Sequence, residues 1–387
     1  MSLADAILSA LAGVLPAGGV KALHEPWFAG KEWEYVKECI DTGWVSTAGK
    51  YVDRFESMLQ DFTGARRAVA VVNGTAALHM AFVLAGVKPG DEVIMPALTF
   101  AATANAAAHL NAVPHFVDCE ERTLGLDPAK LSAYLDQMAE KRDGGVFNRL
   151  TGRRLAAVVP MHTFGHPVDL DPLAALCGRW TLPLVEDSAE SLGSWYKGRH
   201  TGRFGKVGIL SFNGNKTVTC GGGGAILTDD QDLGVLAKHL TTTAKVPHKW
   251  EYFHDAVGYN YRMPNLNAAL GCAQLEQLPD FLKRKRALAE AYRTAFQTVP
   301  GVTFVTEPEA CVSNYWLNAL LLDSEDLNLR NEVLEMTNAV GIMTRPAWTL
   351  MHRLPMYQSC PRMDLAVSES LEKRIINIPS GPRLGRA

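Results

Sequence analysis

Lys216 is a candidate for catalysis or ligand binding, because hydroxyl, amide and glycine residues surround it in SFNGNKTVTCGGGG, residues 211–224. A lysine there could bind a nucleotide phosphate, lie on the surface, or act as a nucleophile. A nucleotide-binding P-loop requires a glycine directly before the lysine. Here Asn215 precedes Lys216, and the glycine run at 221–224 follows it. The spacing excludes a P-loop and leaves the other two interpretations open.

Other common catalytic patterns are also absent from the sequence. His162 and His166 lie four positions apart in HTFGHP, but Gly165 and Pro167 disfavour the helix that would align two metal ligands. We interpret these histidines as hydrogen-bonded scaffold and predict no metal site. The sequence has no Gly-x-Ser-x-Gly nucleophile motif and no Gly-x-Gly-x-x-Gly after its first apolar run. An α/β-hydrolase and a dinucleotide-binding fold are therefore disfavoured.

A lysine that forms a Schiff base with a carbonyl cofactor, such as pyridoxal 5'-phosphate (PLP), explains more of the pattern. PLP needs a carboxylate for its ring nitrogen, apolar contacts for both ring faces, a helix start with hydroxyls for its phosphate, and the lysine. Each need has candidates just after an apolar run. They are Gly74, Thr75, Phe100, Asp187, Ala189, Ser211 and Lys216.

Each candidate also has an ordinary structural interpretation. Asp187 could cap a helix, and Phe100 could belong to the core. Gly74 and Thr75 could form a tight turn, and Lys216 could be a solvated surface residue. We favour the cofactor because the residues satisfy its needs together and in order, which no single ordinary interpretation explains.

The elements that must position these residues are short apolar runs alternating with helix-like or loop segments. Such runs are typical of buried parallel strands, and their alternation with helices predicts an α/β fold with a mainly parallel sheet. Ligands of such sheets lie at the carboxyl ends of the strands, where the candidates occur. The expected strands are 68–72, 92–96, 114–118, 156–160, 182–187 and 208–212.

The pattern divides the chain into three parts. We expect an N-terminal helix or arm at 1–30, a large cofactor-binding domain at 31–275 and a smaller C-terminal α+β domain at 276–387, with VTFVTEP and YWLNALLLD as strands. Helical spacing of apolar residues predicts that the first helix packs on the body or on a partner subunit. Those residues are Leu3, Ile7, Leu8, Leu11 and Leu15.

Two charged segments have no catalytic interpretation. We interpret residues 134–154 as a charged insertion or an extended loop. The basic run 283–286 reads as a solvated helix face rather than a nucleic-acid contact.

Overall composition limits the binding partners and the cellular compartment that we expect for the protein. The chain has 387 residues, a net charge of −3 and a pI near 6.4, which gives no electrostatic footprint for nucleic acid or an anionic membrane. Seven cysteines occur singly, as is typical of a reducing cytoplasm. No basic region precedes the apolar start, and no apolar run reaches membrane-spanning length.

Four long segments resemble the DegT/DnrJ-type sugar aminotransferases. They are NGTAALHMAFVLAGVKPGDEVIMPALTFAATANA (73–106), MHTFGHPVDLDPL (161–173), VEDSAESLGSWYKGRHTGRFGKVGILSFNGNKTVTCGGGGAILTDD (185–230) and GYNYRMPNLNAALGCAQLEQL (258–278). The resemblance covers nearly the whole chain. It implies a PLP-dependent transferase of fold type I, the aspartate aminotransferase fold, with L-glutamate as amino donor.

The resemblance also implies a role for each candidate. Lys216 would form the Schiff base, Asp187 would pair with the pyridinium nitrogen, and Phe100 and Ala189 would contact the two ring faces. Gly74, Thr75 and Ser211 would hold the phosphate. Asn260 would reach the phosphate of the neighbouring subunit, which implies a homodimer with shared active sites.

Glu190 departs from the family pattern. Many members have Gln or His at this position, near the 3-hydroxyl of the cofactor, whereas this chain has a carboxyl group. A carboxylate beside a phenolate is unfavourable unless it is protonated or turned away, so the role of Glu190 in the cofactor site is open.

Subgroup signals suggest the substrate. Four features resemble family members that aminate C4 of a UDP- or GDP-linked 4-keto-6-deoxy sugar. They are GWVSTAGKYVDRFE (43–56), the N-terminal helix, the charged insertion and TRPAWTLMHRLPMY (344–357). Among such substrates we favour UDP-2-acetamido-4-keto-2,4,6-trideoxyhexose, as in legionaminic acid or bacillosamine synthesis. Alternatives are a 3-aminotransferase, a PLP dehydratase (in which histidine replaces the lysine) and a non-catalytic sugar-nucleotide sensor. Candidate contacts for the diphosphate, or else surface or interface ion pairs, are Arg262, Arg345, His352 and Arg353.

Overall fold

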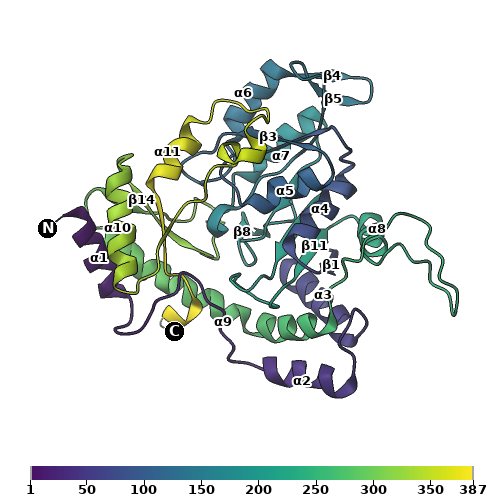
Figure 1. Ribbon diagram of the computed structural model, residues 1–387, viewed down its shortest axis with the longest axis horizontal. Coiled ribbons are helices and arrows are strands. Elements are labelled where there is room, and N and C mark those ends of the chain that lie inside the picture. Colours follow the sequence, from purple (N-terminus) through teal and green to yellow (C-terminus); the bar gives the residue numbers. More distant parts are fainter. Residues whose placement is uncertain (1, 386–387) are drawn as a thin grey trace.

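The computed structural model describes residues 2–385, and its largest element is a mainly parallel sheet (Figure 1). Its strands run in the order β3–β2–β6 and then β7–β10–β11–β1, and single bridges from Val158 to Leu184 and from Met161 to Asp187 join β6 to β7. Among these seven strands, only β11 runs antiparallel to both of its neighbours. The mainly parallel α/β sheet of fold type I is confirmed. The strands are β1 (Arg67–Val71), β2 (Glu92–Pro96), β3 (Val113–Val117), β6 (Arg154–Val158), β7 (Val185–Asp187), β10 (Val207–Ser211) and β11 (Gly224–Thr228).

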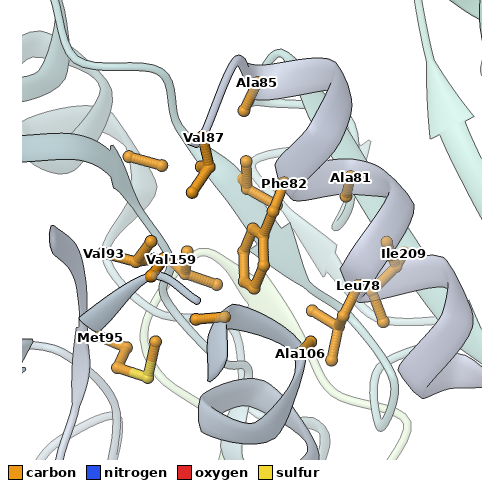
Figure 2. Packing of buried hydrophobic residues seen from close by; sticks show 14 of the residues in the cluster. Leu78, Ala81, Phe82, Ala85, Val87, Val93, Met95, Ala106, Val159 and Ile209 are labelled. Atoms are coloured by element: carbon orange, nitrogen blue, oxygen red, sulfur yellow. The ribbon is translucent and has the colours of Figure 1, made fainter. Parts of the chain in front are cut away.

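Helix α4 (Gly74–Ala85) forms the centre of the main core. Phe82 is fully buried, and Figure 2 shows its ring lying between the helix and residues of the sheet, including Val93 and Val159. Leu78 and Ile209 continue the same apolar cluster toward the next strand. Burial of one such large side chain stabilises the fold by about 1.5–3 kcal/mol. This packing fixes the position of the first turn of α4, which carries two of the candidate residues.

Other helices surround the sheet and complete the large part of the molecule. Their ends follow ordinary capping rules: Asp127 and Asp230 accept hydrogen bonds from the first turns of α6 and α8, and Gly86 ends α4 in the left-handed conformation. These helices are α2 (Glu32–Thr42), α3 (Lys50–Thr63), α5 (Ala101–His109), α6 (Pro128–Met138), α7 (Leu170–Trp180) and α8 (Gln231–Thr241).

The charged segment 134–154 is not an extended loop, so that interpretation is wrong. It completes α6 and then forms a hairpin of β4 (Ala139–Arg142) and β5 (Gly145–Asn148), which extends the sheet beside β6. Side chains tie the hairpin to the sheet: Asn148 Nδ2 and Thr151 Oγ1 donate to the buried carboxylate of Glu92 at 2.9 and 2.6 Å. Charged residues on the exposed positions hid the strand pattern.

The C-terminal part has its own antiparallel sheet, in the order β12–β14–β16–β15. Both predicted strands are present, VTFVTEP in β12 and YWLNALLLD in β14. Ile7 and Leu11 of the N-terminal helix are fully buried in the cluster beneath this sheet, which confirms that the helix packs on the body. The elements are α1 (Leu3–Val14), α9 (Asn265–Phe296), α10 (Leu327–Ala339), α11 (Ala366–Arg374), β12 (Val302–Phe304), β14 (Asn318–Leu322), β15 (Arg345–Pro346) and β16 (Ile375–Ile378).

Short elements connect the two parts. A small sheet pairs β13 with β8 and β8 with β9, and short 3₁₀ turns lie in the connecting segments. Their bounds are β8 (Trp195–Tyr196), β9 (Arg199–His200), β13 (Cys311–Val312), η1 (Thr163–Gly165), η2 (Met351–Arg353), η3 (Pro355–Tyr357) and η4 (Pro382–Leu384).

Helix α9 runs through the expected domain boundary at residue 275. Its first half packs with α2 and α3, and its second half packs with α1 (Figure 1). The prediction of a solvated basic face is wrong for Lys285, which is fully buried and donates to the carbonyls of Trp316 and Ser380 at 3.2 and 2.6 Å. Burial lowers the pKa of Lys285 well below its usual value. Among the described residues, none of the helices combines the length and apolar character needed to cross a bilayer.

Candidate active site

A cavity of about 310 Å³ opens at the carboxyl ends of β1, β2, β7 and β10. Each of these strands ends at or just before residues that line it, as expected for an open α/β sheet. Eight candidate residues predicted from the sequence meet there. They are Gly74, Thr75, Phe100, Asp187, Ala189, Glu190, Ser211 and Lys216.

One end of the cavity is shaped for an anion. Asn73 accepts a hydrogen bond from the Ala76 N–H at 2.8 Å and so starts α4 directly at the cavity. The free N–H groups of that first turn and the helix dipole favour a bound phosphate. A Cβ added to Gly74 would lie 2.9 Å from Cβ and 3.0 Å from Oγ of Ser211. Only glycine lets these two segments approach closely enough to form the cradle.

The glycine run after the lysine serves the same cradle. A Cβ on Gly224, the last of the four, would lie 2.5 Å from the carbonyl oxygen of Asn73. Gly224 therefore lets β11 pass directly behind the start of α4, because a side chain there would displace the backbone.

Asp187 lies at the end of β7 and is almost fully buried. Its carboxylate accepts hydrogen bonds from Thr103 Oγ1 at 2.7 Å and from the Ala189 N–H at 3.2 Å, which fix its orientation toward the cavity. Burial raises the pKa of Asp187 above its usual value, although both hydrogen bonds and nearby Lys216 oppose the shift. A cationic ring nitrogen against this carboxylate would offset the cost of burying its charge.

Glu190 points at the lysine. Its Oε1 lies 3.2 Å from Lys216 Nζ, and its Oε2 accepts a hydrogen bond from the Phe164 N–H at 2.9 Å. Phe164 holds that N–H in place from a left-handed backbone conformation, with φ of 57°, which is uncommon for a non-glycine residue. Burial raises the pKa of Glu190 to about 7, with Lys216 opposing the shift. The 3.2 Å contact shows that the carboxyl is not turned away from the lysine, and burial favours its protonated form.

Two tryptophans that the sequence analysis missed complete the cavity. The ring of Trp316 lies 3.8 Å from Lys216 Nζ, and its indole N–H donates to the Asn215 carbonyl at 2.7 Å. Trp348 packs edge-on against Phe100, with ring centroids 6.0 Å apart. Both lie in segments already recognised, YWLNALLLD and TRPAWTLMHRLPMY, but no pattern in either segment distinguished these rings from core residues.

The remaining candidates, Asn260, Arg262 and three basic residues near the C-terminus, do not line this cavity in the described part of a single chain. Asn260 is exposed on the segment that follows α8, where it bridges to Thr242. Arg262 donates to the carbonyl of Thr47 at 2.9 Å. A contact from Asn260 to a neighbouring subunit is compatible with this exposed position and stays a prediction.

The three basic candidates near the C-terminus contact protein groups instead. Arg345 donates to Asn338 Oδ1 at 2.9 Å, and His352 lies 3.2 Å from the carboxylate of Glu369. Arg353 pairs with Glu372 and lies 3.6 Å from Glu369. The contacts of His352 and Arg353 fit the ion-pair interpretation, whereas Arg345 bonds an amide oxygen, and a diphosphate contact from any of the three stays a prediction.

The two histidines of HTFGHP support the scaffold. His162 Nδ1 accepts a hydrogen bond from the Val168 N–H at 3.2 Å, and Nε2 lies 3.2 Å from the buried carboxylate of Glu186. His166 is buried against the ring of Tyr315, and neither of its ring nitrogens has a hydrogen-bond partner among the described residues. The prediction of a hydrogen-bonded histidine is therefore confirmed for His162 and wrong for His166. Within residues 2–385, no three His, Cys, Asp or Glu side chains group as metal ligands.

The arrangement satisfies each need of PLP. A lysine amine, a buried carboxylate, an exposed aromatic face and a helix N-terminus with a glycine–serine cradle surround one cavity. Phe100 keeps 51% of its surface exposed although it is a large apolar residue at the cavity, so its ring face is free to contact a ligand. The fold and the site thus define a fold-type-I, PLP-dependent enzyme.

Comparison with known proteins gives the particular family. The model of the DegT/DnrJ/EryC1/StrS aminotransferase family matches residues 28–387. GDP-perosamine synthase of Escherichia coli O157:H7 is 35% identical over 94% of this chain and 93% of its own length. The putative pyridoxal phosphate-dependent aminotransferase EpsN of Bacillus subtilis is 36% identical over 94% and 91%. The crystal structure of the aminotransferase TlmJ from Streptoalloteichus hindustanus is 28% identical, with a TM-score of 0.85 and coverage of 95% of both chains.

The chain therefore belongs to the DegT/DnrJ/EryC1/StrS aminotransferase family. It is an enzyme, an aminotransferase of the sugar-aminotransferase family, and PLP is its cofactor. The resemblance seen in the sequence is confirmed.

Proposed function

We propose that this enzyme is a cytoplasmic nucleotide-sugar aminotransferase that moves the amino group of L-glutamate to C4 of a 4-keto-6-deoxy sugar, for the synthesis of a surface glycan. The preferred acceptor is UDP-2-acetamido-4-keto-2,4,6-trideoxyhexose. One observation carries the proposal: Lys216, Asp187 and the start of α4 face one cavity in the arrangement that PLP requires. Similarity to GDP-perosamine synthase supports a nucleotide-linked sugar as the acceptor.

The residues of this chain would divide the chemistry. PLP, when bound, supplies an electron sink that stabilises negative charge at the substrate carbon. Lys216 would hold and then move a proton between substrate and cofactor atoms, as general base and acid. Asp187, buried and fixed by Thr103, would keep a positive charge on the ring nitrogen opposite. Trp316 is 4% exposed and covers the amine of Lys216, which would limit access of water to it.

Charge in the cavity supports a site completed by a second copy of the chain. Among the residues described in one chain, Lys216 is the only cation that lines the cavity. L-glutamate and a sugar diphosphate both carry negative charges that need further cations. We therefore propose a homodimer with shared active sites, in which Asn260 reaches the phosphate of the neighbouring site.

Exposed aromatic residues near Asn260 support the same dimer. Trp250, Tyr252 and Phe253 are 73%, 81% and 62% exposed on the long segment after α8, which extends away from the body in Figure 1. A cluster of exposed large apolar side chains is typical of a protein–protein interface.

A substrate screen tests the function. Purified enzyme loaded with PLP would be mixed with L-glutamate and with UDP- and GDP-linked 4-keto sugars, and products would be identified by mass and by NMR of the aminated carbon. We expect amination at C4, strongest with the UDP-linked 2-acetamido sugar. The Lys216→Ala variant is the control for enzyme-dependent product. Amination at C3, or loss of water without amine transfer, would favour the alternative activities.

A further inference from the structure

The cavity has two chemically different walls. The cofactor wall carries the residues that fit PLP, among them Asp187, Ser211 and Lys216. The aromatic wall is formed by Trp316 and Trp348, and Trp348 packs against Phe100 of the cofactor wall. Both tryptophans come from the chain beyond residue 300, whereas the cofactor residues all precede residue 217. The needs of PLP leave Trp348 without a role.

Trp348 is held firmly although it lies outside regular structure. Its ring centroid lies 5.1 Å from that of Phe164, in addition to the contact with Phe100. The Met351 N–H, three residues later, donates to the Ala97 carbonyl at 3.0 Å and so anchors this segment to the end of β2.

Two of the basic residues predicted to bind substrate, His352 and Arg353, lie on the other side of the segment and contact helix α11. The Leu350 N–H donates to Glu372 Oε1 at 3.0 Å, and the other oxygen of that carboxylate pairs with Arg353. His352 lies beside Glu369 of the same helix, α11. The segment is therefore fixed to both parts of the molecule, and its tryptophan is presented to the cavity in a defined position.

The chemistry of the aromatic wall limits what can lie against it. No charged group of the described chain faces the cavity from this wall, and the one lysine is committed to the cofactor. Aromatic faces contact C–H groups of a sugar ring and methyl groups favourably. The ring faces offer no strong hydrogen-bond partner, so a hydroxyl placed against them would exchange bonds to water for weaker contacts, which is unfavourable.

We infer that Trp348, together with Trp316, forms the subsite for the C5–C6 end of the acceptor sugar and selects a 6-methyl group over a 6-hydroxymethyl group. This inference rests on the proposed function and adds a specificity-determining residue to it. Because an apolar pocket rejects an added hydroxyl only moderately, we expect a preference for the 6-deoxy sugar of about 10-fold.

The test separates the two half-reactions. The glutamate half-reaction is followed alone by the absorbance of the bound cofactor, and the sugar half-reaction by amination of 4-keto sugars with and without the C6 hydroxyl. Trp348→Phe keeps an aromatic face, Trp348→Leu removes it, and Trp180→Leu is a matched control at the half-buried end of α7. Calorimetry with UDP-linked sugars that carry a C4 hydroxyl, in 6-deoxy and 6-hydroxy forms, measures binding without turnover.

The expected pattern is specific to the sugar. Trp348→Leu should lower kcat/KM for the 6-deoxy keto sugar about 10-fold, mainly through KM. It should also reduce the preference for the 6-deoxy form in both amination and binding, because the smaller side chain leaves space in which water can solvate a C6 hydroxyl. The rate of its glutamate half-reaction should stay within about 2-fold of wild type. For Trp348→Phe, the kcat/KM with the 6-deoxy sugar and the 6-deoxy preference should lie between those of wild type and Trp348→Leu. Trp180→Leu should match wild type throughout.

Two different failures are distinguishable. If wild type aminates keto sugars but Trp348→Leu keeps the 6-deoxy preference, or slows both half-reactions equally, the subsite inference is overturned and the proposed function stands. If wild type reacts with glutamate but neither aminates nor binds nucleotide-linked sugars, the proposed function and the inference fall together.

Discussion

The cofactor wall and the aromatic wall of the cavity differ in how the fold builds them. The cofactor wall consists of residues at strand ends or within a few positions after them, so the sheet brings all of them to one edge. Trp316 and Trp348 lie outside helices and strands and reach the cavity because hydrogen bonds anchor their segments to the large part. A wall made by a sheet suits chemistry that must not vary. A wall made by anchored segments can change its side chains, and hence its ligand, without disturbing the sheet.

The two walls also differ in charge. Asp187, Glu190 and Lys216 place three ionisable groups on the cofactor wall, and the first two carboxyls are almost fully buried. The aromatic wall carries no ionisable group among the described residues. Changes to the cofactor wall should therefore impair both half-reactions, and changes to the aromatic wall should alter substrate choice.

Replacement of Lys216 by alanine should have the largest effect. We expect a loss of about 10⁴-fold or more in both half-reactions, because no other amine of the described chain lines the cavity. Borohydride reduction followed by peptide mass spectrometry should find the cofactor attached to Lys216 in wild type and not in the variant. Lys206→Ala, which removes an exposed lysine, is the control. Substantial turnover by Lys216→Ala would contradict the assignment of the nucleophile.

Asp187→Asn should follow, with a loss of about 10²–10³-fold in both half-reactions. An amide keeps the shape, and its oxygen can still accept from Thr103, but its nitrogen cannot accept from the Ala189 N–H and the charge that stabilises a cationic ring nitrogen is lost. Stopped-flow measurement of the glutamate half-reaction gives the effect directly, and Asp232→Asn at an exposed position is the control. A variant that slowed only the sugar half-reaction would break the distinction between the walls.

Glu190 tests the cost of burying charge in the cofactor wall. Burial raises the pKa of Glu190 from 4.5 to about 7, so between these pH values the folded protein retains a proton that the unfolded chain releases. The free energy of unfolding must therefore fall as pH rises through this window, by about 3 kcal/mol from this group. Glu190→Gln cannot titrate, so its cofactor-free form should lack this fall. Denaturant unfolding of both proteins from pH 4 to 8 measures the difference, and parallel curves would contradict a pKa of Glu190 raised by burial.

Much of the fold could be predicted from the sequence because its signals are local. The apolar runs at 92–96 and 208–212 coincide with β2 and β10 to within one residue, and the Asn73–Gly74–Thr75 turn starts α4 as expected. The cofactor wall follows from these elements because the residues after parallel strands must meet at one edge of the sheet. The chemical roles of its residues, and the division of the chain at residues 30 and 275, stay predictions.

The aromatic wall could not be predicted because it depends on contacts between distant segments. Nothing near Trp348 in the sequence indicates that the Met351 N–H will bind the Ala97 carbonyl, some 250 positions away. The same limit explains the basic residues. Arg353 has a carboxylate partner on α11, and Lys285 is buried against backbone carbonyls, although charge alone suggested a ligand contact for one and solvent for the other.

Gly74→Ala should have the smallest of these effects and should act on cofactor affinity alone. The added Cβ would lie 2.9 Å from Ser211 Cβ, so the segments must separate by a few tenths of an ångström and the phosphate cradle widens. Overpacking of this size costs about 1–3 kcal/mol, and we expect a loss of roughly 10-fold in PLP affinity, measured by titration of the cofactor-free protein. Gly178→Ala, in α7 with open space around the added methyl, should bind PLP as wild type does. At saturating PLP, Gly74→Ala should keep the 6-deoxy preference, because the aromatic wall is untouched. Loss of that preference would mean that the two walls are coupled rather than independent.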